Sequence, residues 1–114
     1  MMRLRDCHNF SDFRRMAQQR LPGPIFDYID GAADDEVTYR RNTESFETCD
    51  LVPNVLRGVS EIDMSVTVMG QKLAMPVYCS PTALQRLFHH QGERAVARAA
   101  AKYGTMFGVS SLGT

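Results

Sequence analysis

Two short apolar runs separated by an alanine-rich segment constrain the fold of this chain more than any other feature. The runs are residues 75–80 and 106–111, and the segment between them, 91–103, has a helical pattern. This order predicts a strand, a crossover helix and a second strand, the unit of a parallel sheet with helices outside. Ligands of such sheets bind at the carboxyl ends of the strands. Residues 80–83 and 110–111 are therefore the first candidates for a site.

The composition excludes several classes of partner. The 13 basic residues equal the 13 acidic residues, so the net charge gives no indication of binding to nucleic acid or to an anionic membrane. No apolar stretch approaches the ~20 residues of a membrane span, and residues 1–6 lack the apolar core of a secretory signal. We expect a cytoplasmic protein, or one held peripherally at the inner face of a membrane.

The cysteines and histidines do not form a recognisable metal site. Cys7, Cys49 and Cys79 are far apart and odd in number, which favours a reduced intracellular chain over a disulfide scaffold. Together with the three histidines they have no metal-ligand spacing, so we expect no metal. For the pair His89-His90, solvent exposure is favoured over a catalytic role.

Helical patterns fill the first half of the chain. Asn9 or Ser11 can cap the first helix, and Gly31 is a candidate C-cap for the second. The acidic run 33–36 suits the first turn of the third helix, where the helix dipole favours negative charge. The helices are expected from residue 9 or 11 to 21, over 24–29 and over 33–46.

A small hairpin is expected before the first apolar run. Residues 64–69 alternate with a period of two, and Gly70-Gln71 can turn the chain into Lys72-Leu73. The predicted fold is α/β, with a helical cap over 1–60, a hairpin over 61–74 and a β-α-β unit over 75–114.

Short motifs spread over nearly the whole chain resemble, in their expected order, the FMN-dependent α-hydroxy-acid oxidases and dehydrogenases. This family includes glycolate oxidase, L-lactate dehydrogenase and mandelate dehydrogenase. One such motif would be weak, but the ordered set is specific. The motifs include Phe26-Asp27-Tyr28, Gly31-Ala32, Met75-Pro76, Pro81-Thr82-Ala83, Gly92-Glu93, Ala97-Arg98-Ala99-Ala100 and Ser110-Ser111.

The resemblance implies a (β/α)8 TIM barrel, in which 75–80 is strand 1, 91–103 is helix 1 and 106–111 is strand 2. A complete barrel needs about 250 residues, so we expect the chain to be the N-terminal portion of such an enzyme, with an incomplete barrel. The family's catalytic histidine, carboxylate-binding arginines and flavin-side lysine belong to later segments. No catalytic residue is therefore assigned here, and the piece alone is expected to be inactive.

Tyr28 is the candidate substrate-binding residue. The resemblance implies that its hydroxyl donates a hydrogen bond to the substrate carboxylate, a task that suits a phenol. The alternative is a core tyrosine on a short amphipathic helix, flanked by Ile25, Phe26 and Ile29.

Pro81, Thr82, Ala83 and Ser110 are the candidate FMN-binding residues. The resemblance implies that the backbone of the tripeptide runs along the flavin ring and that Ser110 hydrogen-bonds the ring. The alternatives are a strand-to-helix turn and a strand-end serine that satisfies backbone groups. Ala83 in place of glycine is more similar to the oxidases and lactate dehydrogenases than to the mandelate dehydrogenases. Residues 112–114 lack the aromatic that several members carry, which leaves the pocket's shape open.

The implied activity is oxidation of a small L-2-hydroxy acid, of the lactate, glycolate or mandelate type, to the 2-oxo acid. The implied cofactor is FMN, the electron acceptor is oxygen, a quinone or a cytochrome, and a homo-oligomer (tetramer or octamer) is expected. An alternative is a truncated, non-catalytic chain that acts as an assembly or binding piece. Another FMN- or phosphate-binding barrel is a further alternative, against which the motif at 26–28 argues.

Overall fold

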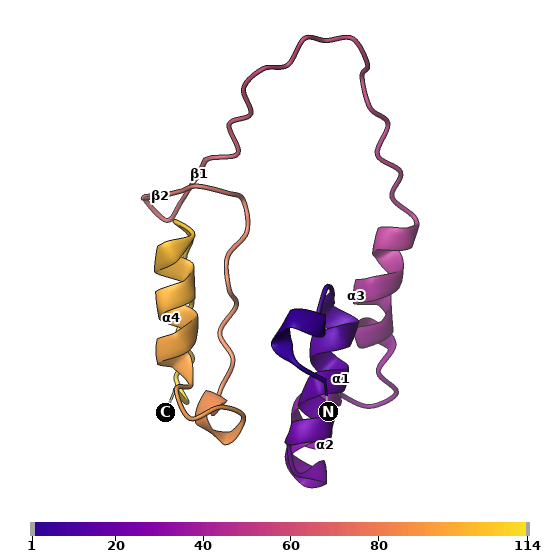
Figure 1. Ribbon diagram of the computed structural model, residues 1–114, viewed down its shortest axis with the longest axis vertical. Coiled ribbons are helices and arrows are strands. Elements are labelled where there is room, and N and C mark those ends of the chain that lie inside the picture. The colour runs from indigo at the N-terminus through magenta and orange to yellow at the C-terminus, as the bar shows by residue number, and fades with distance from the viewer. Residues whose placement is uncertain (1, 114) are drawn as a thin grey trace. The chain divides into compact units, whose positions relative to one another are not determined.

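The computed structural model describes residues 2–113, and the chain forms two compact units, Met1–Arg57 and Gly58–Thr114 (Figure 1). The first contains the helices α1, α2 and α3, and the second contains the hairpin β1–β2 and the helix α4. Within residues 2–113, no helix combines the length and the apolar character that crossing a membrane requires.

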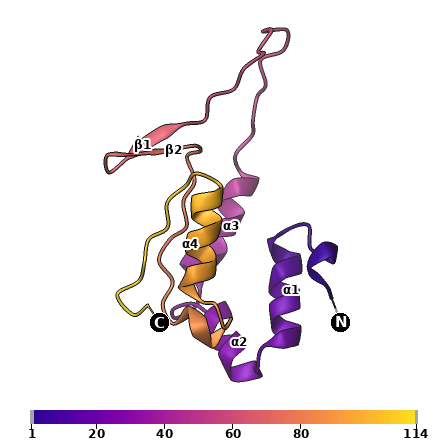
Figure 2. The ribbon, with the colours of Figure 1, turned by 60° about the vertical axis from the view of Figure 1, so that its left-hand side comes forward.

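The helices of the first unit begin and end close to the predicted residues. The helix α1 (Phe10–Arg20) starts after Asn9, whose side-chain oxygen accepts a hydrogen bond from the Asp12 N–H at 2.9 Å. This confirms Asn9 as the N-cap. The helix α2 covers Gly23–Asp30 and begins just after Pro22. Figure 2 shows the sharp turn between these two helices.

The start of the third helix differs from the prediction. The acidic run precedes α3 (Val37–Glu47) and lies outside its first turn. Asp34 and Glu36 have φ angles of 48° and 57°, so they form a left-handed turn that an α-helix cannot include. Gly31 is the C-cap of α2, as predicted. Its φ of −78° does not itself require glycine, but a Cβ there would lie 3.0 Å from the Asp27 carbonyl oxygen.

An ion pair joins α1 to α2. The Arg14 guanidinium donates two hydrogen bonds to the Asp30 carboxylate, from Nε to Oδ1 at 2.5 Å and from Nη2 to Oδ2 at 2.8 Å. Hydrogen bonding to Arg14 lowers the pKa of Asp30 below its ordinary value. The pair therefore adds stability above the ordinary carboxyl pKa, and this stability is lost as the pH falls through the lowered value.

The second unit opens with the predicted hairpin. Strands β1 (Val66–Val68) and β2 (Gln71–Leu73) pair antiparallel, with Val66 opposite Leu73. The turn is Met69-Gly70, one residue earlier than predicted, and both residues have positive φ angles of 51° and 76°. Such angles define the turn type that matches the twist of paired strands. Leu73 is 3 % exposed, so it anchors the hairpin in the unit.

The two predicted barrel strands lie side by side, but they form a single parallel bridge, Cys79 to Phe107, in place of full strands. The Cys79 N–H donates to the Met106 carbonyl and the Gly108 N–H donates to the Cys79 carbonyl, both at 3.0 Å. These alternating bonds have the pattern of a parallel pair. Among residues 2–113, each segment pairs only with the other, and parallel strands are normally buried between others. The parallel order is therefore confirmed, whereas the predicted strand lengths are not observed.

The crossover helix α4 covers Glu93–Lys102, slightly shorter than the expected 91–103. Its Ala100 is 5 % exposed and its Glu93 is 8 % exposed, so one face is buried in the unit. Figure 2 shows the helix beside the two extended segments that it connects.

Candidate functional site

The ends of the two extended segments are held together, as the order of the elements predicts. The Leu84 N–H donates to the Leu112 carbonyl at 3.1 Å, which ties the loop after the first segment to the end of the second. The Gln85 side chain donates to the Thr82 carbonyl at 3.2 Å. The loop 81–85 is thus fixed by groups from both sides of the candidate site.

A buried carboxylate secures this loop to α4. Glu93 Oε1 accepts a hydrogen bond from the Gln85 N–H at 3.3 Å. Sequence reasoning assigned no role to Glu93, although it follows a glycine at the start of a helix, where an acidic side chain reaches exposed backbone donors. Its contact with Gln85 makes it a positioning residue for the loop.

The backbone of the loop presents donors that the protein does not use. Within residues 2–113, the N–H groups of Thr82 and Ala83 donate to no protein acceptor. Thr82 is exposed and Ala83 is half-buried. A flavin ring has several acceptor atoms along its edge, so this donor set fits the cofactor that the resemblance implies.

Ser110 is half-buried at the end of the second segment, and its hydroxyl oxygen accepts the Leu112 N–H at 3.2 Å. The Gly113 N–H donates to the Ser110 carbonyl at 3.0 Å. The serine therefore stabilises a turn, as its alternative role predicts. Its hydroxyl proton has no acceptor among the described residues and stays available to a ligand.

Gly108 allows the two segments to approach each other at the site. A Cβ placed on Gly108 would lie 3.0 Å from Cδ of Pro81. The glycine had not been singled out, although a glycine inside an apolar run indicates a close backbone approach.

Gly108→Ala is expected to lower the stability of the second unit by about 1 kcal/mol or more, because Pro81 is rigid and must shift. Amide chemical shifts should change through residues 79–84. Gly23→Ala is the matched control, since a Cβ there meets nothing within 4 Å. If the two substitutions change the free energy of unfolding equally, the contact between residue 108 and Pro81 does not limit the side chain at residue 108.

Tyr28 lies on α2 in the first unit, with 62 % of its surface exposed. Its neighbour Phe26 is 7 % exposed and takes the buried position on the same helix. The alternative of a core tyrosine is therefore wrong for the chain as the structure describes it. A role in substrate binding stays a prediction.

A shallow, largely apolar hollow of about 340 Å³ lies beside the loop. Its lining residues come from the loop, the turn after it and α4: Thr82, Gln85, Phe88, His89, Gly92, Ala95 and Val96. His89 and His90 are both exposed, as predicted, with ring centroids 4.4 Å apart. Across residues 2–113, no three His, Cys, Asp or Glu side chains are grouped so that they could hold a metal ion.

Comparison with known proteins finds relatives from one enzyme family. The family model described as FMN-dependent dehydrogenase matches residues 17–114. Glycolate oxidase 1 from Oryza sativa subsp. japonica is 42 % identical over 106 residues, which are 93 % of this chain and 29 % of the relative. Glycolate oxidase from Spinacia oleracea is 38 % identical over the same shares.

Solved structures agree with this relationship. A mutant of an active chimera of (S)-mandelate dehydrogenase matches with a TM-score of 0.85 and 36 % identity, over 92 % of this chain and 30 % of that chain. A lactate oxidase from Pediococcus acidilactici matches with a TM-score of 0.86 and 30 % identity, over 95 % and 30 %. The chain thus spans less than a third of the length of these relatives. With the family model matched over most of its residues, the chain belongs to the FMN-dependent dehydrogenase family.

Proposed function

We propose that this chain forms the N-terminal part of an enzyme that oxidises a small L-2-hydroxy acid to the 2-oxo acid with FMN. The observation that carries the proposal is the tied pair of segment ends, where Thr82, Ala83 and Ser110 hold donors that no protein acceptor among residues 2–113 uses. The names of the relatives support the substrate class, since they are glycolate oxidases, a mandelate dehydrogenase and a lactate oxidase.

FMN, when bound, would accept a hydride equivalent from the hydroxy acid. The residues of this chain would hold and orient the ring. The Thr82 and Ala83 N–H groups would donate hydrogen bonds to it, Ser110 would donate from its hydroxyl, and Pro81 would stiffen the loop. A small side chain at residue 83 lets the backbone approach a flat ligand closely.

Tyr28 would bind the substrate carboxylate. A hydroxyl that donates to a charged oxygen gives a directed bond, and such bonds are stronger than those between neutral groups. The exposed position of Tyr28 on α2 leaves its hydroxyl accessible to a ligand.

The remaining features of the proposal come from the sequence patterns and the family resemblance. They are a complete (β/α)8 barrel beyond the first β-α-β unit, with a helical cap over 1–60 and a hairpin over 61–74. They also include oxygen, a quinone or a cytochrome as electron acceptor and a homo-oligomeric assembly. The cytoplasm, or the inner face of a membrane, is the proposed location; one structural relative is a soluble mutant of a membrane-associated (S)-mandelate dehydrogenase.

A chimera tests the proposal directly. This chain replaces the matching N-terminal region of rice glycolate oxidase 1, with which it is 42 % identical. We expect the purified chimera to retain FMN and to oxidise at least one of glycolate, L-lactate and L-mandelate. A folded chimera without flavin or activity would contradict the proposal and favour a non-catalytic assembly or binding piece.

The chain on its own is expected to bind FMN weakly and to be only marginally stable. Its parallel pair has open edges, and many large apolar side chains are exposed, with Leu51 at 95 % and Leu56 at 101 %. Titration of FMN into the purified chain, followed by flavin fluorescence, measures the affinity. Stoichiometric binding at micromolar concentration would contradict this expectation.

A further inference from the structure

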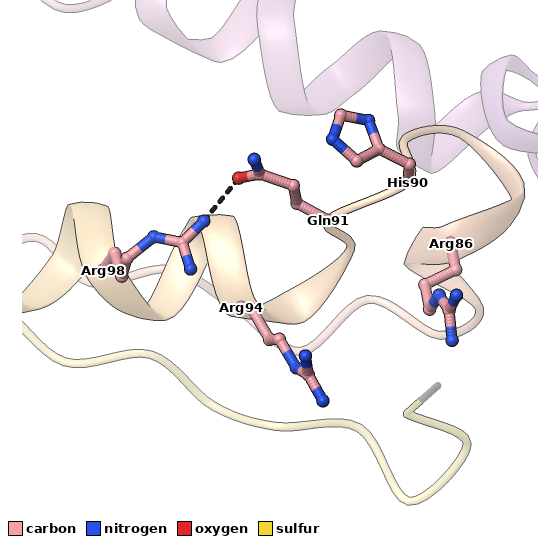
Figure 3. A pocket seen from close by; sticks show the side chains of 5 residues that line it. All are labelled: Arg86, His90, Gln91, Arg94 and Arg98. Atoms are coloured by element: carbon pink, nitrogen blue, oxygen red, sulfur yellow. Dashed lines mark hydrogen bonds between the residues drawn. The ribbon is translucent and has the colours of Figure 1, made fainter.

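An arginine cluster on the second unit is not explained by the proposed function. It consists of five exposed residues that line a hollow of about 390 Å³: Arg86, His90, Gln91, Arg94 and Arg98. Arg86 comes from a short 3-10 helix (Gln85–Leu87), His90 and Gln91 come from the turn before α4, and the other two come from α4. Figure 3 shows Arg86 and Arg94 pointing in the same direction from these different elements, with Arg98 turned toward Gln91.

The exposed surface of α4 carries charge of one sign. Arg94, Arg98 and Lys102 follow each other at intervals of four residues, about 6 Å apart along the axis. The helix has one carboxylate, Glu93, which is buried and accepts a hydrogen bond from the loop. Like charges at this interval destabilise a helix, and a bound anion would offset their repulsion.

The two arginines of α4 also lack a carboxylate partner in the protein. Arg14 on α1 forms an ion pair, whereas neither Arg94 nor Arg98 has a carboxylate within ion-pair distance among residues 2–113. The residues lining the hollow include no acidic side chain. The positive charge is concentrated at this hollow, because the chain as a whole has a formal net charge of zero.

The chemistry of the donors indicates which anion fits. A guanidinium offers a planar fork of N–H groups that matches the oxygens of a phosphate group. Arg98 donates to the Gln91 side-chain oxygen, which leaves the amide nitrogen of Gln91 as a further donor. The hollow lies within the usual range of small-ligand sites, about 300 to 1,000 Å³.

We infer that the arginine cluster binds a phosphate group carrying two or more negative charges. The group could belong to a soluble phosphate compound or to a lipid headgroup that ends in a phosphomonoester, because both present the same doubly charged oxygens. The inference is independent of the proposed oxidation chemistry and uses none of the residues assigned to it.

Titration of the isotope-labelled chain with pyrophosphate, at constant ionic strength set with chloride, tests the inference. We expect saturable shifts of the Arg94 and Arg98 Nε–H resonances at millimolar or lower concentration. In Arg94→Gln/Arg98→Gln the affinity should fall about tenfold or more, since a bond to a charged group contributes ~1.5–3 kcal/mol. The matched control Arg41→Gln/Arg57→Gln removes the same charge from exposed arginines elsewhere and should bind as the unmodified chain does.

Co-sedimentation with phosphatidylcholine vesicles, with and without phosphatidic acid, whose phosphomonoester can carry two negative charges, distinguishes the source of the phosphate. If the chain binds the anionic vesicles, and if both pyrophosphate and the cluster substitutions abolish this binding, the phosphate group belongs to a lipid headgroup. Pyrophosphate binding without vesicle binding would assign a soluble phosphate compound. Equal affinity of the two glutamine double variants, or no saturable binding of either probe, would overturn the inference.

A further variant controls for the possibility that the substitutions unfold α4. Circular dichroism should show unchanged helix content in Arg94→Gln/Arg98→Gln. If the content falls, Arg94→Lys/Arg98→Lys decides, because it keeps the charge and the helix propensity and removes the guanidinium forks. Weaker pyrophosphate binding by the lysine variant supports the site, and undiminished binding contradicts it.

Discussion

Tyr28→Phe is expected to lower kcat/KM for the hydroxy acid by about ten- to a hundredfold in the chimera, while FMN stays bound. The substitution removes one hydroxyl, and a hydrogen bond to a charged carboxylate contributes ~1.5–3 kcal/mol. The protein should fold normally, because Tyr28 is 62 % exposed and Phe26 supplies the buried aromatic group of α2. Steady-state kinetics with glycolate, L-lactate and L-mandelate, together with the flavin content of the purified protein, measure both effects.

Tyr39→Phe is the matched control, since this tyrosine lies on α3 and is 37 % exposed. It loses the same hydroxyl and should leave kcat/KM unchanged. If both variants behave alike, or if Tyr28→Phe keeps the original kcat/KM for every substrate, the carboxylate role of Tyr28 is wrong.

The parts of the fold that local chemistry determines were predictable from the sequence. Asn9 caps α1 because its side chain reaches a free backbone N–H within one turn, and this depends only on neighbouring residues. The hairpin follows from alternating apolar residues and from a glycine that tolerates positive φ. The parallel arrangement of residues 79 and 107 was also predictable, because two apolar runs joined by a helix have few other ways to pair.

The differences arise where the outcome depends on more than local preference. The acidic run before α3 has the charge for a first helical turn, but its backbone adopts a left-handed turn. Barrel strands gain their length from neighbours on both sides, whereas in the part of the chain that the structure describes the two segments pair only with each other. The site residues that were missed also depend on tertiary contacts. Glu93 bonds to a residue outside its own helix, and Gly108 approaches Pro81, which is distant in the chain.

Ala83→Val is expected to weaken FMN binding by the chimera about tenfold, lower its activity and shift the flavin absorption bands. The physical reason is the position of residue 83 in a loop held on both sides, by the Leu84–Leu112 hydrogen bond and by the bond from Gln85 to Thr82. A loop fixed in this way cannot retreat from a branched side chain, so the added bulk displaces the ligand that lies against the backbone. Ala83→Gly should keep FMN bound but alter reactivity, because it removes a methyl group and loosens the loop.

Ala97→Val provides the comparison that separates a cofactor effect from a folding effect. Ala97 is exposed on α4, where valine costs about 0.5 kcal/mol of helix stability or less. It should leave the flavin spectrum and the FMN affinity unchanged. Thermal unfolding with saturating FMN should then show only a small change for both variants. A valine at residue 83 that lowers the unfolding temperature without moving the flavin bands would mean that residues 81–83 form only a turn, and the cofactor assignment of the loop would be withdrawn.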